Sequence, residues 1–424
     1  MRRLIGAAAL VGACHASSAL AAEAQTKASA FNRDRNVAVR ERTHPEYQPL
    51  GVRLGAFQSF PTVALDLEHT DNVFATDAGS RADTIFRLRP EATLRSTWSR
   101  HELDLGASAS VNRFARSGSE NSADVNVFAN GRLDVVGNSY LIGGAAYDYA
   151  TVPRTSADTP GDAAEPVRYQ TFRVNGGGAY ELNRLRFIVL GDATRFDYAN
   201  PDAVGGGKVF VQDRDRTLLS VSGKAEYALT PGTALYLIAS ANKRDYRLDP
   251  PAVTLNRDSD GAEIDLGANF DLARLARGEI QFGYLVQNYD AAGAPPVKGV
   301  GAKVSVEYFP TQLITMTFKG RRGIDDSGLP GAAGILATQG SVQADYELRR
   351  NLILTGLVGR TDDSYRGLDR DDKRTTATLS ATYLMNRRLS WYLAFTRYEQ
   401  TSSGTDQGTD FTDNRLLISA KLHY

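Results

Sequence analysis

The feature that most constrains the fold is a hairpin unit that recurs from Thr62 to the end of the chain. Each unit has about a dozen alternating residues, a tight turn, about a dozen more alternating residues and then a longer polar loop. Tight turns such as "TWSRHE", "YELNRL" and "ALTPGTA" follow one another at intervals of roughly 41 residues, the length of two strands, one turn and one loop. Propeller blades have a similar period, but a blade contains four short strands, whereas each period here contains two long ones. The repeat therefore predicts a sheet of long antiparallel hairpins.

Alternation within the strands separates an apolar face from a polar face. In "EIDLGANFDL", Ile264, Leu266 and Phe270 fall on one side, and Glu263 and Asp265 fall on the other. Strands of this length suit a tilted crossing of a bilayer, whereas the strands of a soluble sandwich are usually shorter. We therefore expect an all-β fold, a transmembrane antiparallel β-barrel of about 18 strands, with 16 as the nearest alternative. Tight turns alternate with long loops such as "TVPRTSADTPGDAAEP", which predicts short periplasmic turns and longer extracellular loops.

Aromatic residues fall near both ends of the predicted strands. Tyr180 and Tyr308 come shortly before tight turns, while Tyr246, Tyr365 and Tyr398 come just before long loops. Outer-membrane barrels carry aromatic girdles at both water interfaces. We expect these residues to form two such girdles.

The first residues have the composition of a secretory signal. "MRRLIGAAALVGACHASSALAAEAQ" begins with two arginines, continues with an apolar run and ends in small residues. We assign residues 1–22 to a signal peptide, which implies export through the inner membrane to a bacterial outer membrane. The single cysteine, Cys14, lies in this segment, and "LVGAC" also fits a loose lipobox, so a lipidated Cys14 stays an alternative.

Two further segments follow the signal. Residues 23–61 show no clear period, and we expect a periplasmic leader or a short plug folded into the lumen. Residues 62–424 form the predicted barrel. Beyond the signal, no apolar stretch approaches the roughly 18 to 20 residues that a membrane helix needs.

The closing peptide "NRLLISAKLHY" keeps the period of two up to its last residue. A barrel's last strand pairs with its first, so a chain can end on a strand without leaving an open edge. An aromatic end preceded by alternating apolar residues also resembles the signal that bacterial barrel-assembly machinery reads. The candidate assembly signal consists of Leu416, Ile418, Ala420, Leu422 and Tyr424.

Charged residues predicted to face the lumen are candidates for a transport path. Acidic residues concentrate near the predicted periplasmic turns and arginines near the outer loops, and such a field could orient a charged solute. The alternative is a solvated rim whose arginines pair with lipopolysaccharide phosphates or loop acids. The candidates are Arg87, Arg89, Glu91, Arg95, Arg113, Arg195, Arg321, Arg360 and Arg397.

The sequence offers no constellation for catalysis or metal binding. The five histidines are scattered over the signal, the leader and separate strands, and no nucleophile stands beside a base. "NRDSDG" begins like a calcium loop, but Gly267 occupies the position of the bidentate glutamate. We expect no enzyme activity, no catalytic residue, no metal and no cofactor. The balance of 49 basic and 49 acidic residues also argues against a nucleic-acid partner.

Two stretches resemble a known family. "RTHPEYQPLGVRLGAFQSFPTVALDLEHTDNVFAT" and "LRPEATLRSTWSRHELDLGASAS" are similar to the opening of the β-barrel porin type-2 family of Gram-negative outer-membrane proteins. The resemblance is strongest over residues 42–111. It rests on the "DNVF" element after the first strand and the "WSRH" turn after the second. Members are often associated with exopolysaccharide or capsule production, so the resemblance implies a channel without fixing its solute.

Three functions remain open. We favour a passive conduit that exports an exopolysaccharide or capsular polysaccharide, with outer-membrane lipid, lipopolysaccharide, barrel-assembly machinery and periplasmic export components as partners. The alternatives are a general or small-sugar diffusion porin, and a structural or surface-interaction barrel with a blocked lumen. Diffusion porins usually fold a long loop inward, and loops here do not much exceed about 15 residues. This favours an open lumen or one closed by the leader.

Overall fold

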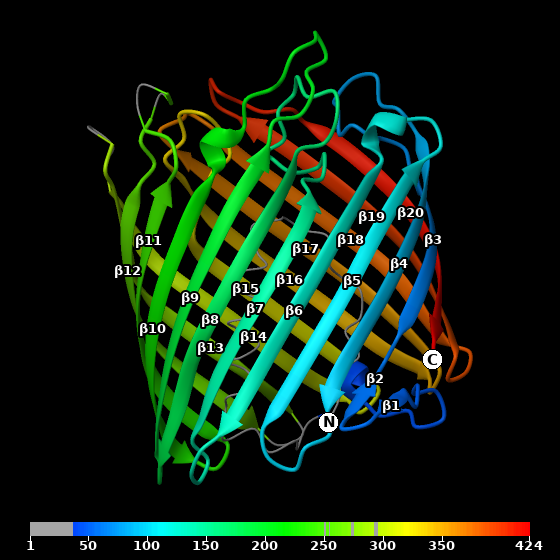
Figure 1. Cartoon of the computed structure of the whole chain (residues 1–424), viewed down its shortest axis with the longest axis vertical. Helices are drawn as coiled ribbons and strands as arrows, with labels where there is room; N and C mark the ends of the chain where they lie inside the picture. Colours follow the sequence, from blue (N-terminus) through cyan, green and yellow to red (C-terminus); the bar gives the residue numbers. More distant parts are fainter. Residues whose placement is uncertain (1–36, 250–251, 254, 273–274, 292–295) are drawn as a thin grey trace.

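The computed structural model describes residues 37–249, 252–253, 255–272, 275–291 and 296–424. Within these residues, 18 antiparallel strands form a closed barrel (Figure 1), as the repeat of hairpins predicted. The strands of the barrel are β3 (Thr62–Thr70), β4 (Asp83–Ser96), β5 (Glu102–Phe114), β6 (Ser122–Asp134), β7 (Tyr140–Thr151), β8 (Arg168–Leu182), β9 (Leu185–Ala199), β10 (Arg216–Thr230), β11 (Thr233–Tyr246), β12 (Ser259–Leu272), β13 (Ala276–Tyr289), β14 (Val297–Thr311), β15 (Ile314–Asp325), β16 (Gly334–Arg349), β17 (Leu352–Arg366), β18 (Asp371–Leu384), β19 (Leu389–Ser403) and β20 (Phe411–His423).

The barrel closes between its last strand and its first. β20 pairs antiparallel with β3 from Arg415 opposite Thr70 to His423 opposite Thr62. The backbone N–H of Tyr424 donates to the Pro61 carbonyl at 3.2 Å. The polar backbone of the closing peptide is therefore paired on both sides, because β19 lies along its other edge.

The two ends of the barrel differ in their connections. Tight turns join the strands at the lower end of Figure 1, where the chain also ends, and the longer loops gather at the upper end. This is the asymmetry that the sequence predicted, with short periplasmic turns and long extracellular loops.

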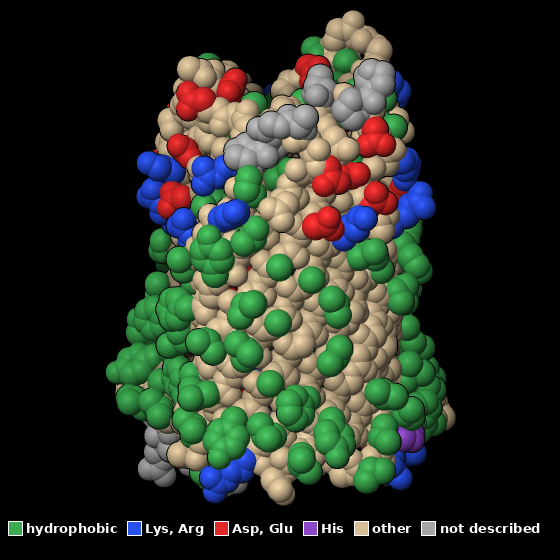
Figure 2. All heavy atoms as spheres, turned by 90° about the vertical axis from the view of Figure 1, so that its left-hand side faces the viewer, with side chains coloured by type: hydrophobic (Ala, Val, Ile, Leu, Met, Phe, Trp, Pro, Cys, Tyr) green, Lys and Arg blue, Asp and Glu red, His purple; other side chains and the backbone are tan. Residues whose placement is uncertain are grey.

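The period of two produces an apolar outside and a polar inside. Ile264 and Leu266 are 60 and 68 % exposed on the outer face, while Asp265 between them is 2 % exposed and faces inward. Figure 2 shows hydrophobic side chains covering the wall of the barrel and charged side chains gathered above it. Because the apolar residues face outward, the wall suits contact with hydrocarbon.

Smaller elements flank the barrel. The hairpin of β1 (Val52–Leu54) and β2 (Phe57–Ser59) extends its periplasmic end, where β2 pairs with the end of β4. Short 3₁₀ turns form η1 (Val39–Glu41), η2 (Gly118–Glu120) and η3 (Gln212–Arg214). In the part of the chain that the structure describes, no helix has the length and apolar character needed to cross a membrane.

The expected outer aromatic girdle is wrong for several tyrosines. Tyr180 and Tyr308 near the periplasmic turns are 58 and 37 % exposed on the outer face, in agreement with the prediction. Tyr246 and Tyr365 near the outer loops are instead 6 and 3 % exposed and face inward. Tyr246 has the opposite parity to the outward-facing Leu235, so the pleat of β11 turns it into the barrel.

Candidate functional site

The leader enters the barrel at its periplasmic end. The backbone N–H of Val39 donates to Thr315 Oγ1 at 2.9 Å, and Val39 is 1 % exposed. Arg40 Nε lies 2.7 Å from Asp345 Oδ1, and Arg42 Nη1 lies 2.6 Å from a carboxylate oxygen of Glu347 on β16. The exposed, outward-facing Tyr346 separates the two acids, so both acids face the lumen. We call residues 37–44, held inside the wall in this way, the periplasmic latch.

The latch also contacts the wall on a second side. Glu41 accepts from Arg277 Nη2 at 2.5 Å, and Arg277 pairs in turn with Glu307. Arg277 belongs to β13 and Glu307 to β14, whereas the ion-pair partners of Arg40 and Arg42 belong to β16. The latch therefore joins separate stretches of the inner wall.

The β15–β16 loop (residues 326–333) folds over the lumen at the outer end. Asp326 forms ion pairs with Arg216 Nε on β10 at 2.8 Å and with Arg244 on β11. Neither strand is a neighbour of β15 in the sheet. Burial by itself would raise the pKa of Asp326, but the Arg244 and Arg216 guanidinium groups outweigh it and hold the pKa at about 2. The carboxylate is thus charged at neutral pH and ties the loop to a distant part of the wall.

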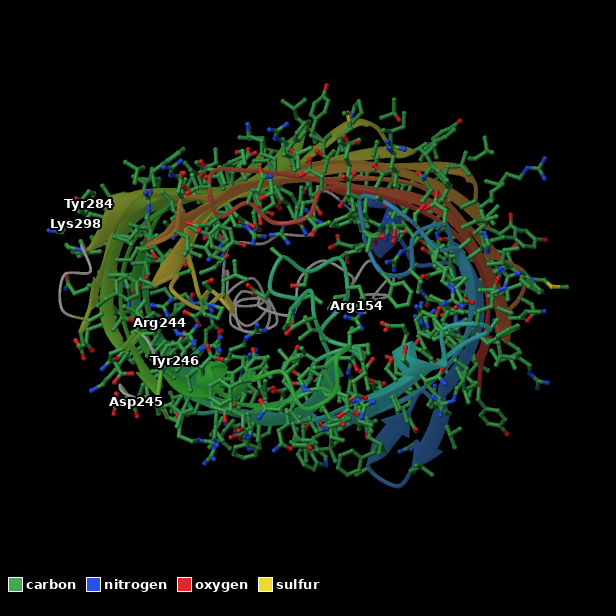
Figure 3. All side chains as sticks on the ribbon, turned by 90° about the horizontal axis from the view of Figure 1, so that it is seen from above. Arg154, Arg244, Asp245, Tyr246, Tyr284 and Lys298 are labelled. Atoms are coloured by element: carbon green, nitrogen blue, oxygen red, sulfur yellow. The ribbon has the colours of Figure 1, made fainter. Side chains whose placement is uncertain are left out.

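A second loop meets the first from another part of the barrel. In the β7–β8 loop (residues 152–167), Asp158 Oδ1 accepts from the Gly328 N–H at 3.0 Å. Arg154 donates two hydrogen bonds, of 2.9 and 2.8 Å, to the Glu120 carboxylate on η2. Figure 3 shows Arg154 well inside the ring of strands. Further support comes from Arg257, whose Nη1 donates to the Ser327 carbonyl at 2.9 Å.

Apolar packing supports both loops from below. Ala332 in the β15–β16 loop packs with Ile335 and Tyr365, and Val152 beside the β7–β8 loop packs with Tyr169. The expectation that these loops are too short to fold inward is therefore wrong. Their reach depends on where their ends leave the wall and on which side chains hold them, and loop length measures neither.

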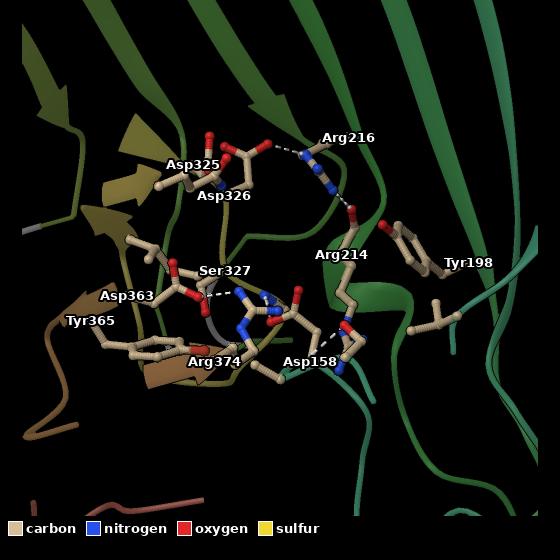
Figure 4. A pocket seen from close by; sticks show the side chains of 16 residues that line it. Asp158, Tyr198, Arg214, Arg216, Asp325, Asp326, Ser327, Asp363, Tyr365 and Arg374 are labelled. Carbon is tan, nitrogen blue, oxygen red and sulfur yellow. Dashed lines mark hydrogen bonds and ion pairs between the residues drawn. The ribbon is translucent and has the colours of Figure 1, made fainter. Parts of the chain in front are cut away.

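A cavity of about 60 Å³ lies between the inward-folded loops and the wall (Figure 4). We call it the outer cavity. Its charged and hydroxyl-bearing side chains come from the two loops, from η3 and from strands on both sides. They are Ser156, Asp158, Tyr198, Arg214, Arg216, Asp325, Asp326, Ser327, Asp363, Tyr365 and Arg374.

The comparisons with known proteins agree with the barrel. A sequence profile of the family described as "Putative beta-barrel porin 2" matches residues 44–424. The chain belongs to this family. It is a porin-like β-barrel channel of the bacterial outer membrane. The resemblance seen in the first third of the sequence is thereby confirmed.

Solved structures with a similar fold include other outer-membrane proteins. OpdK from Pseudomonas aeruginosa is 15 % identical, with a TM-score of 0.47, over 87 % of this chain and 99 % of that one. OccAB3 from Acinetobacter baumannii is 12 % identical, with a TM-score of 0.45, over 88 % of this chain and 100 % of that one. A BenF-like porin from Pseudomonas fluorescens Pf-5 is 13 % identical, with a TM-score of 0.47, over 86 % of this chain and 99 % of that one. Among curated proteins, none matches the chain.

The candidates on the second strand of this porin-family barrel face inward and pair with their neighbours. Arg87 and Arg89 alternate with the exposed, outward-facing Leu88. The closest ion-pair distances are Arg87–Glu68 at 3.3 Å, Arg89–Asp66 at 2.6 Å, Glu91–Lys421 at 3.3 Å and Arg95–Asp104 at 3.2 Å. A role in transport for these residues stays a prediction.

Arg321 also faces inward, and it contacts Asp325 on its own strand at 2.6 Å. The other arginine candidates do not face the lumen, which corrects the expectation. Thr194 and Phe196, on either side of Arg195, are buried in the lumen side of the wall, whereas the Arg195 side chain is 59 % exposed. A strand presents neighbouring residues to opposite faces, and the remaining arginine candidates likewise fall on the outward-facing positions of their strands. The outward-facing candidates are Arg113, Arg195, Arg360 and Arg397.

Sequence reasoning did not single out Asp326, Arg216 or Arg214 at the outer end of the lumen. Parity with Leu235 and Leu237 would have placed Arg244 inside, and Figure 3 shows Arg244 on the lumen side and Asp245 outside. Asp326 and Arg214 lie in loops, where no period tells inside from outside. Only its distant partners, Arg216 and Arg244, reveal what Asp326 does.

Metal binding and catalysis both need side chains that are grouped in space. Within the described residues, no three His, Cys, Asp or Glu side chains are grouped so as to hold a metal ion. His69 lies on the exposed side of β3, with Nδ1 3.2 Å from Thr84 Oγ1. The signal peptide assignment and Cys14 fall on residues 1–36, outside the described part of the chain.

Proposed function

We propose that the barrel is a passive diffusion channel for small solutes, with an outer mouth narrowed by its own loops. The observation that carries this proposal is the position of Asp326, which is held between Arg216 and Arg244 on a distant part of the wall. A loop fixed across the lumen limits the width of anything that passes. Solutes therefore have to be small, or the loop has to move.

The family resemblance favours export of a polysaccharide. A polymer in transit occupies the whole length of the lumen, and both the latch and the loops would lie in its way. This obstruction makes diffusion of small solutes, including small sugars, the better supported candidate. A structural barrel with a blocked lumen predicts no conductance at all.

Liposome swelling separates these candidates. Purified barrel in liposomes should admit monosaccharides rapidly and exclude oligosaccharides of increasing length, because the inward loops set a size limit. Free entry of long oligosaccharides would favour the polysaccharide conduit. A barrel that is folded yet silent in both swelling and planar-bilayer recordings would favour the structural reading.

Ion selectivity should depend on the inward-facing charges. Arg321 lies in the lumen beside Asp325, whereas Arg195 lies on the outer surface beside Asp197. We expect Arg321→Gln to shift the cation-to-anion permeability ratio and Arg195→Gln to leave it unchanged. Equal effects of the two variants on the reversal potential would contradict a lumen field set by these residues.

The outward-facing arginines near the outer loops suit a contact with lipopolysaccharide. Arg113, Arg195, Arg360 and Arg397 are exposed in the outer half of their strands. Figure 2 shows a band of mixed charges above the apolar wall on the side it displays. Guanidinium groups bind phosphates well. Replacement of all four by Gln should reduce lipopolysaccharide retained during purification, and undiminished retention would contradict this partner.

Export and assembly also belong to the proposal. A signal peptide over residues 1–22 and recognition of the closing strand by barrel-assembly machinery would bring the chain to the outer membrane. Leu416, Ile418 and Leu422 are exposed on the outer face, and Tyr424 is 74 % exposed at the end of the strand. Removal of Tyr424 should lower the folded fraction in the outer membrane. An unchanged fraction would argue against an assembly role.

A further inference from the structure

We propose that the outer cavity is a binding site for small hydroxycarboxylates, with the carboxylate on Arg214 and the hydroxyl group on Asp158. The inference rests on the proposed function, because such a solute would meet this cavity between the inward-folded loops on its way through the barrel. It adds a chemical preference that a plain size limit would not give.

Arg214 is a buried cation without a direct ion pair. Its side chain lines the cavity, and the residue is only 5 % exposed. Its Nε is buried and has no hydrogen-bond partner, and within the described residues no ion pair joins its guanidinium group to a carboxylate. Its guanidinium donors are therefore available to a carboxylate that enters the cavity, and such charge-assisted hydrogen bonds are strong.

The other arginines of the cavity already have carboxylate partners. Arg216 pairs with Asp326, and Arg374 pairs with Asp363. Figure 4 shows Arg214 running from below Arg216 towards Asp158. An anion that enters would therefore find its free partner in Arg214, and a guanidinium group can bind a carboxylate through two parallel hydrogen bonds.

Asp158 supplies the second contact. One of its oxygens, Oδ1, accepts from the Gly328 N–H, and within the described residues no hydrogen bond to Oδ2 occurs. A methyl group placed on Gly328 would lie 2.9 Å from Asp158 Cγ and 3.0 Å from Arg214 Cζ. Both charged groups therefore face the same small space beside this glycine. A solute with a carboxylate and a neighbouring hydroxyl donor matches this pair.

The size of the cavity restricts the solute further. A volume of about 60 Å³ holds a few water molecules. A three-carbon hydroxycarboxylate such as lactate can place its polar groups there, whereas a sugar chain cannot. Lactate is therefore a suitable probe, with propionate as the analogue lacking the hydroxyl group and propane-1,2-diol as the analogue lacking the carboxylate.

Titration calorimetry on the full-length barrel in detergent micelles tests the site. Lactate should bind more tightly than propionate, and propane-1,2-diol should bind weakest. Arg214→Gln should weaken lactate binding by roughly tenfold or more, since a charge-assisted contact is lost. Asp158→Asn should mainly reduce the preference for lactate over propionate. Arg195→Gln, which removes an arginine from the outer surface, is the matched control and should bind like the natural chain.

Gly328→Ala gives a second test that keeps every charge. The added methyl group would crowd both Arg214 and Asp158, so lactate binding should weaken although the barrel stays folded. Equal binding of lactate and propane-1,2-diol to the natural chain would overturn the proposal, as would full lactate affinity in Arg214→Gln. A silent barrel that still binds lactate would refute the channel alone, whereas a conducting barrel that does not discriminate among the probes would refute this site alone.

Discussion

The two ends of the lumen are narrowed by different means. At the periplasmic end, the latch is held by Arg40 and Arg42, whose side chains are 31 and 24 % exposed, although their partners Asp345 and Glu347 are only 4 and 7 % exposed. At the outer end, Asp326 is held by Arg216 and Arg244, whose side chains are 5 and 10 % exposed. The outer loop is also continuous with a strand at each of its ends, whereas the latch rests on the wall mainly through side chains.

This difference in burial indicates a difference in strength. Ion pairs on an exposed surface typically contribute about 1 kcal/mol or less, and the half-buried pairs of the latch lie between that limit and a fully buried pair. Removing one partner of a buried pair is far more costly, at roughly 3–5 kcal/mol. We therefore expect the latch to detach from the wall more easily than the β15–β16 loop. The β15–β16 loop should set the size limit for solutes. The following predictions test that contrast.

Deletion of residues 23–44 should have the largest effect. It removes the whole latch while the β1–β2 hairpin and the barrel stay intact, so single-channel conductance should rise severalfold. Replacement of Arg40, Glu41 and Arg42 by Gln should raise the conductance less, because the segment can still occupy the lumen. Arg53→Gln is the control, since Arg53 contacts only the carbonyl of Gly55 among the described residues. Unchanged conductance in the deletion variant would show that the latch does not restrict flow.

Asp326→Asn should have the next largest effect. The change keeps the shape of the side chain but leaves Arg216 and Arg244 without their common anion, at a cost of roughly 3–5 kcal/mol. We expect the β15–β16 loop to detach and larger sugars to enter in liposome swelling. If the size limit stayed the same, another contact would be holding the loop.

Acidification should release the β15–β16 loop from the wall only at low pH. The folded pKa of Asp326, about 2, lies below its ordinary value of 3.8, because the two arginines outweigh the effect of burial. Because its pKa is lowered, the Asp326 carboxylate stabilises the folded position of the β15–β16 loop fully above about pH 4. This contribution is roughly 2.5 kcal/mol, and it is lost as the pH falls towards 2. Conductance of the barrel without its latch should stay constant down to about pH 4 and rise below it. Asp326→Asn should lack that rise, and a transition near pH 6 would contradict the assignment.

Salt should have the smallest effect, and it should act on one end only. The Debye length falls from about 10 Å at 0.1 M to about 3 Å at 1 M salt, and exposed pairs are screened more than buried ones. After correction for bulk conductivity, high salt should raise conductance in the full chain and leave the variant without the latch unaffected. Equal salt dependence of both proteins would remove the contrast between the two ends.

The sequence determined the wall of the barrel because the wall depends on local alternation. Ile264 and Leu266 alternate with Asp265, and tight turns alternate with long loops, so strand length, orientation and closure all follow from a pattern visible along the chain. The same pattern also contained the direction of Arg195 and Arg244. Nearness to the outer loops suggested a lumen role for Arg195, but its parity decided the face.

Only the tertiary structure decided what lies inside the wall. Asp326 meets Arg216 and Arg244 because the closed sheet brings β10 and β11 within reach of the β15–β16 loop, and nothing in the spacing of these residues along the chain encodes that approach. The same holds for Arg40 and Asp345, and for the space that Arg214 and Asp158 share beside Gly328. Loops and leader have no period, so their positions follow from contacts between residues far apart in sequence, which exist only once the barrel has closed.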